Sequence, residues 1–240
     1  MARKVSRKSL KHDEFVEAAF DFEQWIEEHW MPLAWVAGTA LAITLAVWGW
    51  SWWSGRANAE SARIVAEGLQ EIRSDATAEA AAATDPAGRY RAALASFQKA
   101  AERAPRSPAG QVARFYEGAS LLRLGKPTEA IAVLEPLAGS AKKGFLGDAA
   151  RAQLAWAYAQ ARQTDQSVQA WKDLAARSDA AYPADLALYN AAAILAGAGR
   201  GAEAKTLLED VTTRFPQGPA FQDASRLLSK VGGSVAAPAR

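Results

Sequence analysis

Small, large and apolar residues recur in a fixed order at four places along the chain. Four segments align without gaps: AALASFQKA, EAIAVLEPL, QSVQAWKDL and EAKTLLEDV. Each has a small residue, a large one four positions later and an apolar one three positions beyond, which is helical spacing. The small residues lie 37 positions apart and are Ala93, Ala130, Ser167 and Ala204. The large ones, which we expect to pack between repeated units, are Phe97, Leu134, Trp171 and Leu208.

The segments that precede these helices follow the same period. Each carries a small residue, again 37 positions apart, at Gly118, Ala155 and Ala192. We expect Gly125 and Gly199 to end such helices, because glycine readily takes the left-handed conformation of a C-cap. Pro105 and Pro216 are expected to close second helices of the pairs, since proline cannot continue a helix. The sequence therefore predicts repeated helix pairs.

The first and last units depart from this pattern. The first helix of the first pair is missing at the expected offset, and we assign it to Asn58–Arg73 (NAESARIVAEGLQEIR). Ser74–Gly88 is then expected to be a loop or a weak Ala-rich helix. Pro219–Val231 is expected to form a capping helix that presents Arg226 and Lys230 to water. Gly232–Arg240 is expected to be a flexible tail.

An uncharged apolar segment precedes the repeats. Pro32–Trp53 holds no charged residue, and as a helix it would be roughly 33 Å long, which matches the apolar thickness of a bilayer. Tryptophans mark both of its ends, as at membrane interfaces: Trp30, Trp35, Trp48, Trp50, Trp52 and Trp53. We predict one transmembrane helix that contacts lipid over Pro32–Trp53. A cleaved signal peptide is disfavoured, because the apolar run is too long and a long acidic segment precedes it.

The charges on either side of this segment predict its orientation. Five basic residues precede it, whereas only Arg56 and Arg63 closely follow it. The positive-inside rule then places the N-terminus in the cytoplasm and the repeats in the periplasm, with the chain in a bacterial inner membrane. The reverse topology, with the repeats in the cytoplasm, stays open.

Residues 1–31 are expected to form a cytoplasmic arm. Asp13 can cap a helix that runs to His29, whereas Met1–Lys11 is expected to have no fixed structure. An apolar stripe at helical spacing includes Phe15, Phe22, Trp25 and Ile26. Seven acidic residues between Asp13 and Glu28 disfavour an anionic lipid surface as the partner. Two interpretations remain, namely a partner-binding helix and a solvated surface helix.

Composition excludes several kinds of chemistry. The chain has no cysteine, and its two histidines, His12 and His29, lie outside the repeats. Thiolate metal sites, disulfides and histidine-based catalysis in the repeats are therefore excluded. With a net charge of +2 and no basic stripe, we expect no nucleic-acid partner. No catalytic or phosphate-binding fingerprint occurs, so we expect no enzyme activity, no cofactor, no metal and no small-molecule substrate.

These features together resemble tetratricopeptide-repeat membrane proteins, and in particular the ancillary Sec-translocon subunit family of bacterial inner membranes. The expected fold is all-α, with an N-terminal amphipathic helix, one transmembrane helix and a tetratricopeptide-like α-solenoid of about four helix pairs with a C-terminal capping helix. The expected parts are residues 1–31, 32–53, 54–231 and 232–240. The resemblance implies binding of translocon subunits, periplasmic chaperones or newly exported chains.

First helices line the concave surface of tetratricopeptide folds, which gives candidate groove residues. The main candidates are Phe115, Leu122, Trp156 and Tyr189, with alanines between them at Ala119, Ala152, Ala159, Ala193 and Ala196. Such apolar stripes also form cores, so for Trp156 both a groove and a core position stay open. An apolar peptide or helix is the expected ligand.

The expected function is a membrane-anchored, chaperone-like adaptor that binds proteins beside the inner-membrane export machinery. The alternative is a structural scaffold of another cell-envelope complex, in outer-membrane assembly or in division.

Overall fold

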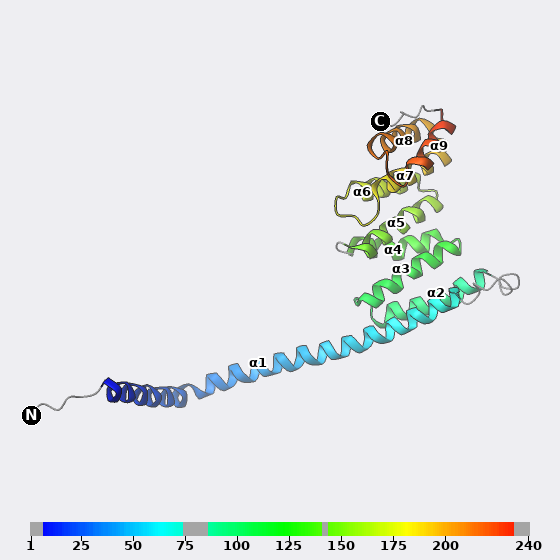
Figure 1. Ribbon diagram of the computed structural model, residues 1–240. Helices are drawn as coiled ribbons and strands as arrows, with labels where there is room; N and C mark the ends of the chain where they lie inside the picture. The colour runs from blue at the N-terminus through cyan, green and yellow to red at the C-terminus, as the bar shows by residue number, and fades with distance from the viewer. Residues whose placement is uncertain (1–6, 74–85, 141–143, 233–240) are drawn as a thin grey trace, which may run out of the picture. The chain divides into compact units, whose positions relative to one another are not determined.

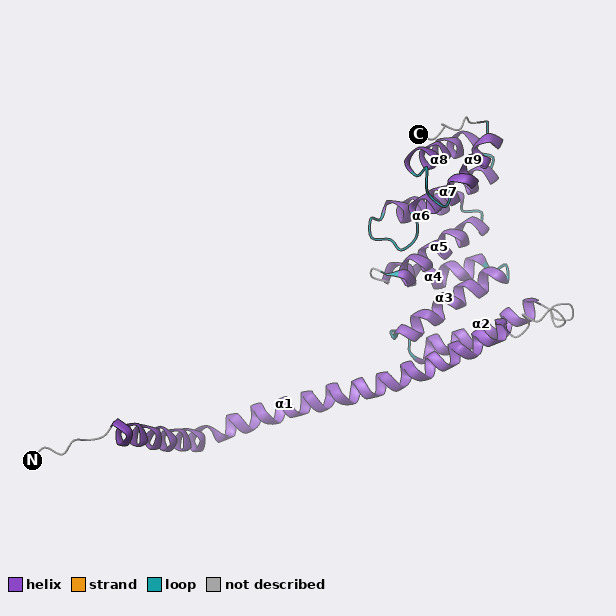
Figure 2. Cartoon of the chain, in the orientation of Figure 1, coloured by secondary structure: helices purple, strands orange, loops and turns teal. Residues whose placement is uncertain are grey.

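The computed structural model describes residues 7–73, 86–140 and 144–232; the side chains of residues 7–38, 40 and 86 are not among those described. Over these ranges the chain forms helices and no strand (Figure 2). The helices are α1 (Arg7–Arg73), α2 (Pro86–Arg103), α3 (Pro108–Arg123), α4 (Pro127–Ser140), α5 (Phe145–Gln160), α6 (Thr164–Ala176), α7 (Ala184–Gly197), α8 (Gly201–Arg214) and α9 (Phe221–Lys230). The all-α expectation is confirmed for the described residues.

The chain divides into two units, residues 1–55 and residues 56–240. Most of the first unit belongs to α1, which begins at Arg7 rather than at Asp13. The expectation that Met1–Lys11 has no fixed structure is therefore wrong for residues 7–11. Lysine, arginine and leucine in this stretch have good helix propensities, so the helix extends beyond the capping aspartate.

The described side chains of the first unit are strongly exposed. Eight large apolar residues are 55–70% exposed: Leu41, Ile43, Leu45, Val47, Trp48, Trp50, Trp52 and Trp53. Within the described part of the chain, no helix combines the length and the apolar character needed to cross a membrane. The transmembrane helix over Pro32–Trp53 is thus not confirmed and stays a prediction, whose residues 32–38 and 40 lie outside the described side chains.

In the second unit, each helix from α2 to α9 packs against the next one along the chain (Figure 1). In addition, α3 contacts α5 and α7 contacts α9. The helices α3, α5 and α7 end at residues 123, 160 and 197, and α4, α6 and α8 begin at residues 127, 164 and 201. These intervals confirm the period of 37 and give an α-solenoid, a fold in which each unit packs on its neighbours.

The C-terminal part of α1 is the first helix of the first pair, as expected. Ile64 and Val65 are buried in one cluster with Phe97 on α2, and Gly68 leaves the space that the Phe97 ring fills. The Ser61 hydroxyl donates to the backbone carbonyl of Ala100 over 2.8 Å. Helix α2 begins at a proline inside the stretch expected to be a loop or weak helix, and residues 74–85 of that stretch lie outside the described residues.

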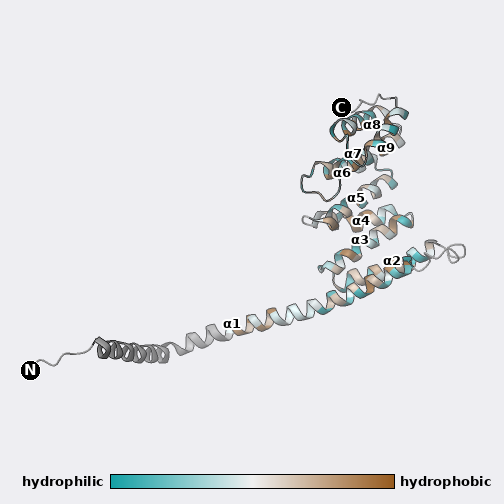
Figure 3. Ribbon diagram, viewed as in Figure 1, coloured by the Kyte–Doolittle hydropathy of each residue, from teal (hydrophilic) through white to brown (hydrophobic). Residues whose placement is uncertain are grey.

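The repeated small and large residues form the core of the solenoid. All four small residues and all four large ones of the second helices are fully buried. The Ser167 hydroxyl donates a hydrogen bond to the Ala155 carbonyl over 2.7 Å, and Gly118 leaves room for the Leu134 side chain. Polar residues cover the outer faces, so apolar and polar colours alternate around these helices in Figure 3. The packing role predicted for these positions is confirmed.

Three first helices end in the same hydrogen-bonded turn. Gly125 and Gly199 have φ values of 70° and 78°, as expected for left-handed caps. The equivalent residue of the middle turn is Arg162, with a φ of 61°. In each turn this residue and the next donate backbone hydrogen bonds to carbonyls of the helix that ends, for example from Gln163 to Tyr158 over 2.8 Å. The caps at the two glycines are confirmed, and the strained one at Arg162 is new.

The helix ends at the two prolines and the C-terminal capping helix also agree with the expectations from the sequence. Helices α2 and α8 stop two residues before Pro105 and Pro216. Helix α9 lies within the expected capping segment, with Ala224 and Leu228 buried and Arg226 exposed, as is Lys230. The capping helix is therefore confirmed.

Candidate protein-binding groove

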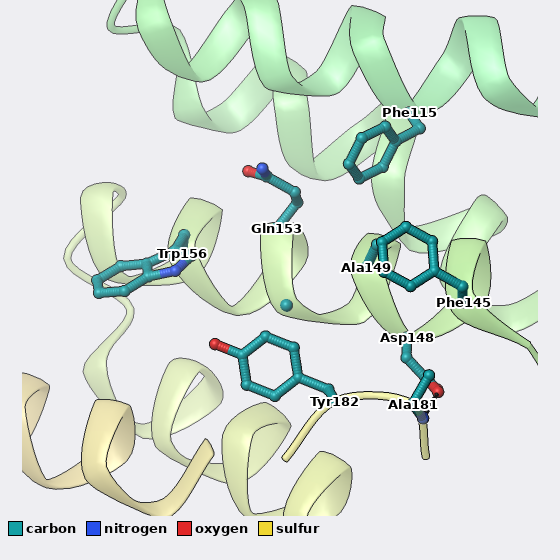
Figure 4. A pocket seen from close by; sticks show the side chains of 9 residues that line it. Phe115, Phe145, Asp148, Ala149, Gln153, Trp156, Ala181 and Tyr182 are labelled. Atoms are coloured by element: carbon teal, nitrogen blue, oxygen red, sulfur yellow. Dashed lines mark hydrogen bonds between the residues drawn. The ribbon is translucent and has the colours of Figure 1, made fainter. Parts of the chain in front are cut away.

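An aromatic pocket opens on the surface of α5. Its volume is about 250 Å³. Helix α5 from Phe145 to Trp156, the middle of α3 and the loop before α7 supply its walls (Figure 4). The lining residues are Phe115, Phe145, Asp148, Ala149, Ala152, Gln153, Trp156, Ala181 and Tyr182. Phe145 is 78% exposed, which is unusual for a phenylalanine and places its ring at the mouth of the pocket.

Trp156 joins this pocket to the core. Trp156 is 40% exposed, and its ring packs edge to face with that of Trp171, with the ring centroids 5.6 Å apart. Trp171 is fully buried and also contacts Tyr182, at 5.5 Å between centroids. The Tyr182 hydroxyl accepts a hydrogen bond from Asn190 over 3.0 Å. Burial raises the pKa of the Tyr182 phenol above its usual value, so it stays protonated. The pocket therefore has preorganised walls.

Asp148 closes one end of the pocket without offering a free charge. Its carboxylate is buried and accepts a hydrogen bond from the Ala181 backbone N–H over 2.7 Å. Arg151 donates to the other oxygen at 3.2 Å, and Arg177 lies 3.6 Å from it. Asp185, 37 positions later, likewise accepts from the Ala220 backbone N–H over 2.9 Å. Asp148 on α5 thus fixes the loop before α7, and Asp185 on α7 fixes the loop before α9.

A second pocket lies against the same helix. Its volume is about 400 Å³ and its lining residues are Ile72, Tyr90, Tyr116, Ala119, Ser120, Leu122, Arg123, Gln153, Trp156 and Gln160. Gln153 and Trp156 belong to both pockets, so they separate two hollows of one groove. Arg123 supplies the one charged side chain among the lining residues of this second pocket.

A third hollow, between α2, α3 and α4, is more polar. It has a volume of about 440 Å³ and contains Glu102, Arg114 and Glu117. Burial raises the pKa of Glu117, against a hydrogen bond from Gln98 and the charge of Arg114, which lower it, while Glu102 adds to the rise. In the part of the chain that the structure describes, no group of acidic or histidine side chains is arranged to hold a metal ion.

The structure brings three of the four main candidates to the groove. Phe115 and Trp156 line the aromatic pocket, and Leu122, although mostly buried, lines the second one. Ala152 and Ala119 lie in these pockets as well. Trp156, for which groove and core were both open, takes part in both.

Other candidates lie elsewhere. Tyr189 packs against the buried cluster around Leu188 and Leu208 and lines neither pocket. Ala159, Ala193 and Ala196 also line neither of these two pockets. The arm candidates Phe15, Phe22, Trp25 and Ile26 lie outside the described side chains.

Two aromatic walls were missed in the sequence. Phe145 and Tyr182 are 37 positions apart, so they are equivalent residues of successive repeats. The same is true of Asp148 and Asp185. The period itself was the signal for both pairs, but they lie at or before helix starts, outside the middle positions from which groove residues were taken.

Comparisons with known proteins agree with this geometry. The sequence profile of the tetratricopeptide repeat family matches residues 186–218, which cover α7, α8 and the turn beyond. No curated protein matches the chain. The helical repeat part thus carries a tetratricopeptide repeat in sequence as well as in fold.

Solved structures with similar folds are tetratricopeptide proteins. One, a tetratricopeptide repeat protein from Parabacteroides merdae, has a TM-score of 0.53 at 14% identity, over 72% of this chain and 60% of that one. This chain therefore spans less than two thirds of that protein. Another, from Podosopora anserina and described as a kinesin light chain with nearly identical TPR-like repeats, has a TM-score of 0.54 at 16% identity, over 71% and 86%. Such identities show the fold alone, which is a tetratricopeptide-like α-solenoid.

Proposed function

We propose that this chain is a membrane-tethered adaptor whose repeat domain binds protein partners in the groove along α5, beside the inner-membrane export machinery. The observation that carries the proposal is the exposure of Trp156 and Phe145 at the mouth of a preorganised pocket. Exposed aromatic residues on a rigid scaffold are characteristic of protein-binding sites, because they bury large apolar areas at little entropic cost.

The solenoid supports a binding role over a catalytic one. Tetratricopeptide folds serve as interaction scaffolds, and the profile match at residues 186–218 assigns this chain's last full pair to that type. The groove offers aromatic rings, the carboxamides of Gln153 and Gln160 and one cation, with the Asp148 carboxylate already occupied. This set of groups suits the capture of a polypeptide segment rather than bond making or breaking.

The tether is proposed for residues 32–53. Its support is the uncharged sequence with tryptophans at both ends, together with the apolar side chains between Leu41 and Trp53 that are more than half exposed on the described helix. A helix that is apolar on all sides is stable only inside a protein core or in lipid. The positive charges before the segment favour a cytoplasmic N-terminus and a periplasmic repeat domain.

The location can be tested by crosslinking in cells. We expect the full chain, purified after mild crosslinking, to carry translocon subunits, periplasmic chaperones or newly exported chains. A Trp156→Ala variant should lose these partners while staying in the membrane fraction. Recovery of the chain without any export component, at normal expression, would reject the proposed site of action.

A scaffold role in another envelope complex is the second candidate, favoured by the apolar stripe of the arm, which includes Phe15, Phe22 and Trp25 and could pack on a partner helix. Deleting residues 1–31 separates the two. A scaffold held by its arm should lose its complex, whereas a groove-based adaptor should keep its partners.

Carbonate extraction adds a direct test of the tether, because an integral membrane protein stays in the membrane pellet at alkaline pH.

A further inference from the structure

The two pockets of the groove meet at Gln153 on α5. Figure 4 shows its side chain standing from α5 between the rings of Phe115 and Trp156. Its carboxamide makes no hydrogen bond with the residues that the structure describes. A carboxamide has both donors and an acceptor, so it can pair with the backbone N–H and C=O of one residue in an extended chain, which point to the same side.

The aromatic pocket selects an uncharged side chain. Its cavity of about 250 Å³ is walled by the rings of Phe115, Phe145 and Trp156, with Tyr182 opposite. The Asp148 carboxylate could attract a cation, but the Ala181 N–H and the Arg151 guanidinium already occupy its oxygens. A charged ligand group would lose its hydration here without gaining a partner. A large apolar side chain fits the pocket in both size and polarity.

The second pocket favours a charged ligand side chain instead of an apolar one. Arg123 stands exposed at the C-terminal end of α3 and pairs with none of the described residues. A guanidinium binds a carboxylate in bidentate geometry, which makes an acidic side chain the complementary group. The neighbouring Gln160 and Ser120 are polar and carry no charge that would compete with it.

Gln153 also distinguishes between ligand conformations. Within a helix, the backbone N–H and C=O groups bond to one another, so the middle of a helical ligand has none to share with Gln153. In an extended segment, the N–H and the C=O of every second residue point to the same side and are free to bond there. The unpaired carboxamide between two side-chain pockets therefore suits an extended segment that crosses α5.

We propose that the groove binds an extended polypeptide segment that places a large apolar side chain in the aromatic pocket, the backbone N–H and C=O of one residue on Gln153 and an acidic side chain on Arg123. This specificity rests on the proposed protein-binding function and deepens it. It predicts that partners are recognised by an apolar and an acidic residue on opposite sides of Trp156.

A peptide array tests this specificity directly. The probes are short peptides, blocked at both ends, each with one phenylalanine and one glutamate, and the set covers every separation between the two. In matched sets, lysine or glutamine replaces the glutamate. In a further set, alanine replaces the phenylalanine. The full-length chain in mild detergent is labelled and applied. We expect peptides with phenylalanine and glutamate at one preferred separation to bind at least about tenfold better than the lysine and alanine sets.

Three variants assign the contacts. Arg123→Glu should shift the preference from glutamate to lysine, whereas Lys99→Glu, an exposed charge change outside the pockets, should not. Phe145→Ser, at a side chain too exposed to matter for folding, should weaken every phenylalanine peptide. Gln153→Leu should weaken binding about tenfold whatever the side chains of the peptide, as expected for a lost backbone contact.

The outcomes separate this inference from the proposed function. Equal binding of glutamate and lysine peptides, an unchanged preference in Arg123→Glu, or better binding of helix-stapled peptides would each overturn the inference. If crosslinked export partners are nevertheless found in cells, the adaptor role stands without this specificity. A clear peptide preference without export partners would instead support the groove and reject the proposed location.

Discussion

Arg162 occupies a backbone position that Gly125 and Gly199 fill in the neighbouring repeats. Its φ of 61° costs a residue with a Cβ about 1 kcal/mol or more. Replacing Arg162 with glycine should therefore raise the free energy of unfolding by about 0.5–1 kcal/mol, after the greater flexibility of glycine in the unfolded chain is deducted. Denaturant or thermal unfolding of the purified chain measures this.

Arg162→Ala is the matched control for that change, because alanine removes the charge and keeps the Cβ. We expect no gain in stability from it. Equal stabilisation by glycine and alanine would show that the side chain of Arg162, and not its backbone conformation, carries the cost.

Loss of a buried aspartate should lower the stability of the solenoid strongly. Asp148→Ala leaves the Ala181 N–H unpaired and two guanidinium groups without their buried partner. We expect a loss of about 3 kcal/mol in the free energy of unfolding. Asp223→Ala removes an exposed carboxylate that also pairs with an arginine, and should cost less than about 1 kcal/mol. Equal losses in the two variants would contradict the fastening role of Asp148.

Glu117 should give the solenoid a distinct pH dependence. Burial raises the pKa of this carboxyl in the folded state above its usual 4.5, so the folded protein holds the proton more tightly than the unfolded chain. Its contribution to stability is therefore present at pH values below 4.5 and is lost as the pH rises through the raised pKa. Glu117→Gln should remove this decline. Identical pH profiles of melting temperature in the two proteins would contradict burial as the dominant cause.

Sequence reasoning at the residue scale succeeded where the chemistry of one residue type decides the structure. Gly125 and Gly199 were predicted as caps because glycine alone adopts their conformation without cost. Asp148 was not predicted, since an acid in the first turn of a helix is common on exposed surfaces for its effect on the helix dipole. Its buried role depends on a loop more than thirty residues away in the chain, which only the tertiary fold brings near.

At the scale of elements, close approach between paired helices depends on small residues. Gly118 on α3 faces Leu134 on α4, and a Cβ at that position would collide with the leucine side chain. Gly118→Ala should lower the free energy of unfolding by about 1–3 kcal/mol through overpacking.

The matched control is Gly139→Ala, also within a helix but next to open space. It should be neutral or stabilising by up to about 1 kcal/mol, because alanine favours a helix over glycine. A loss at Gly139 as large as that at Gly118 would mean that packing against Leu134 is not the cause.

Helix boundaries were predictable where the period was regular, from α3 to α8. They were less so at the N-terminal end, where α1 continues from Arg7 to Arg73 without a break. The sequence suggested a helix from Asp13 to His29 that ends before the apolar segment, whereas α1 runs through both. Pro86 also begins α2 inside the expected loop, which fits the preference of proline for the first turn of a helix.

At the scale of the whole repeat domain, one period produces both the core and the groove. Residues that recur every 37 positions on second helices are buried, whereas the first-helix positions Ala119, Trp156 and Ala193, also 37 apart, vary from alanine to tryptophan and are partly exposed. Regular packing therefore supports a groove whose aromatic residues gather around α5. The sequence indicated this groove at Phe115, Leu122 and Trp156. Its other aromatic residues, Phe145 and Tyr182, are also 37 positions apart, but they lie at or before helix starts and were not taken as groove residues.

The central claim is that polypeptide partners bind along α5. The most direct measurement is site-specific photocrosslinking in living cells, with a photoreactive amino acid in place of Phe145 or, for comparison, of Lys205 on the exposed side of α8. We predict crosslinks to other proteins from position 145, abolished by Trp156→Ala, and few from position 205. Equal crosslinking from both positions, or none from position 145, would contradict the account.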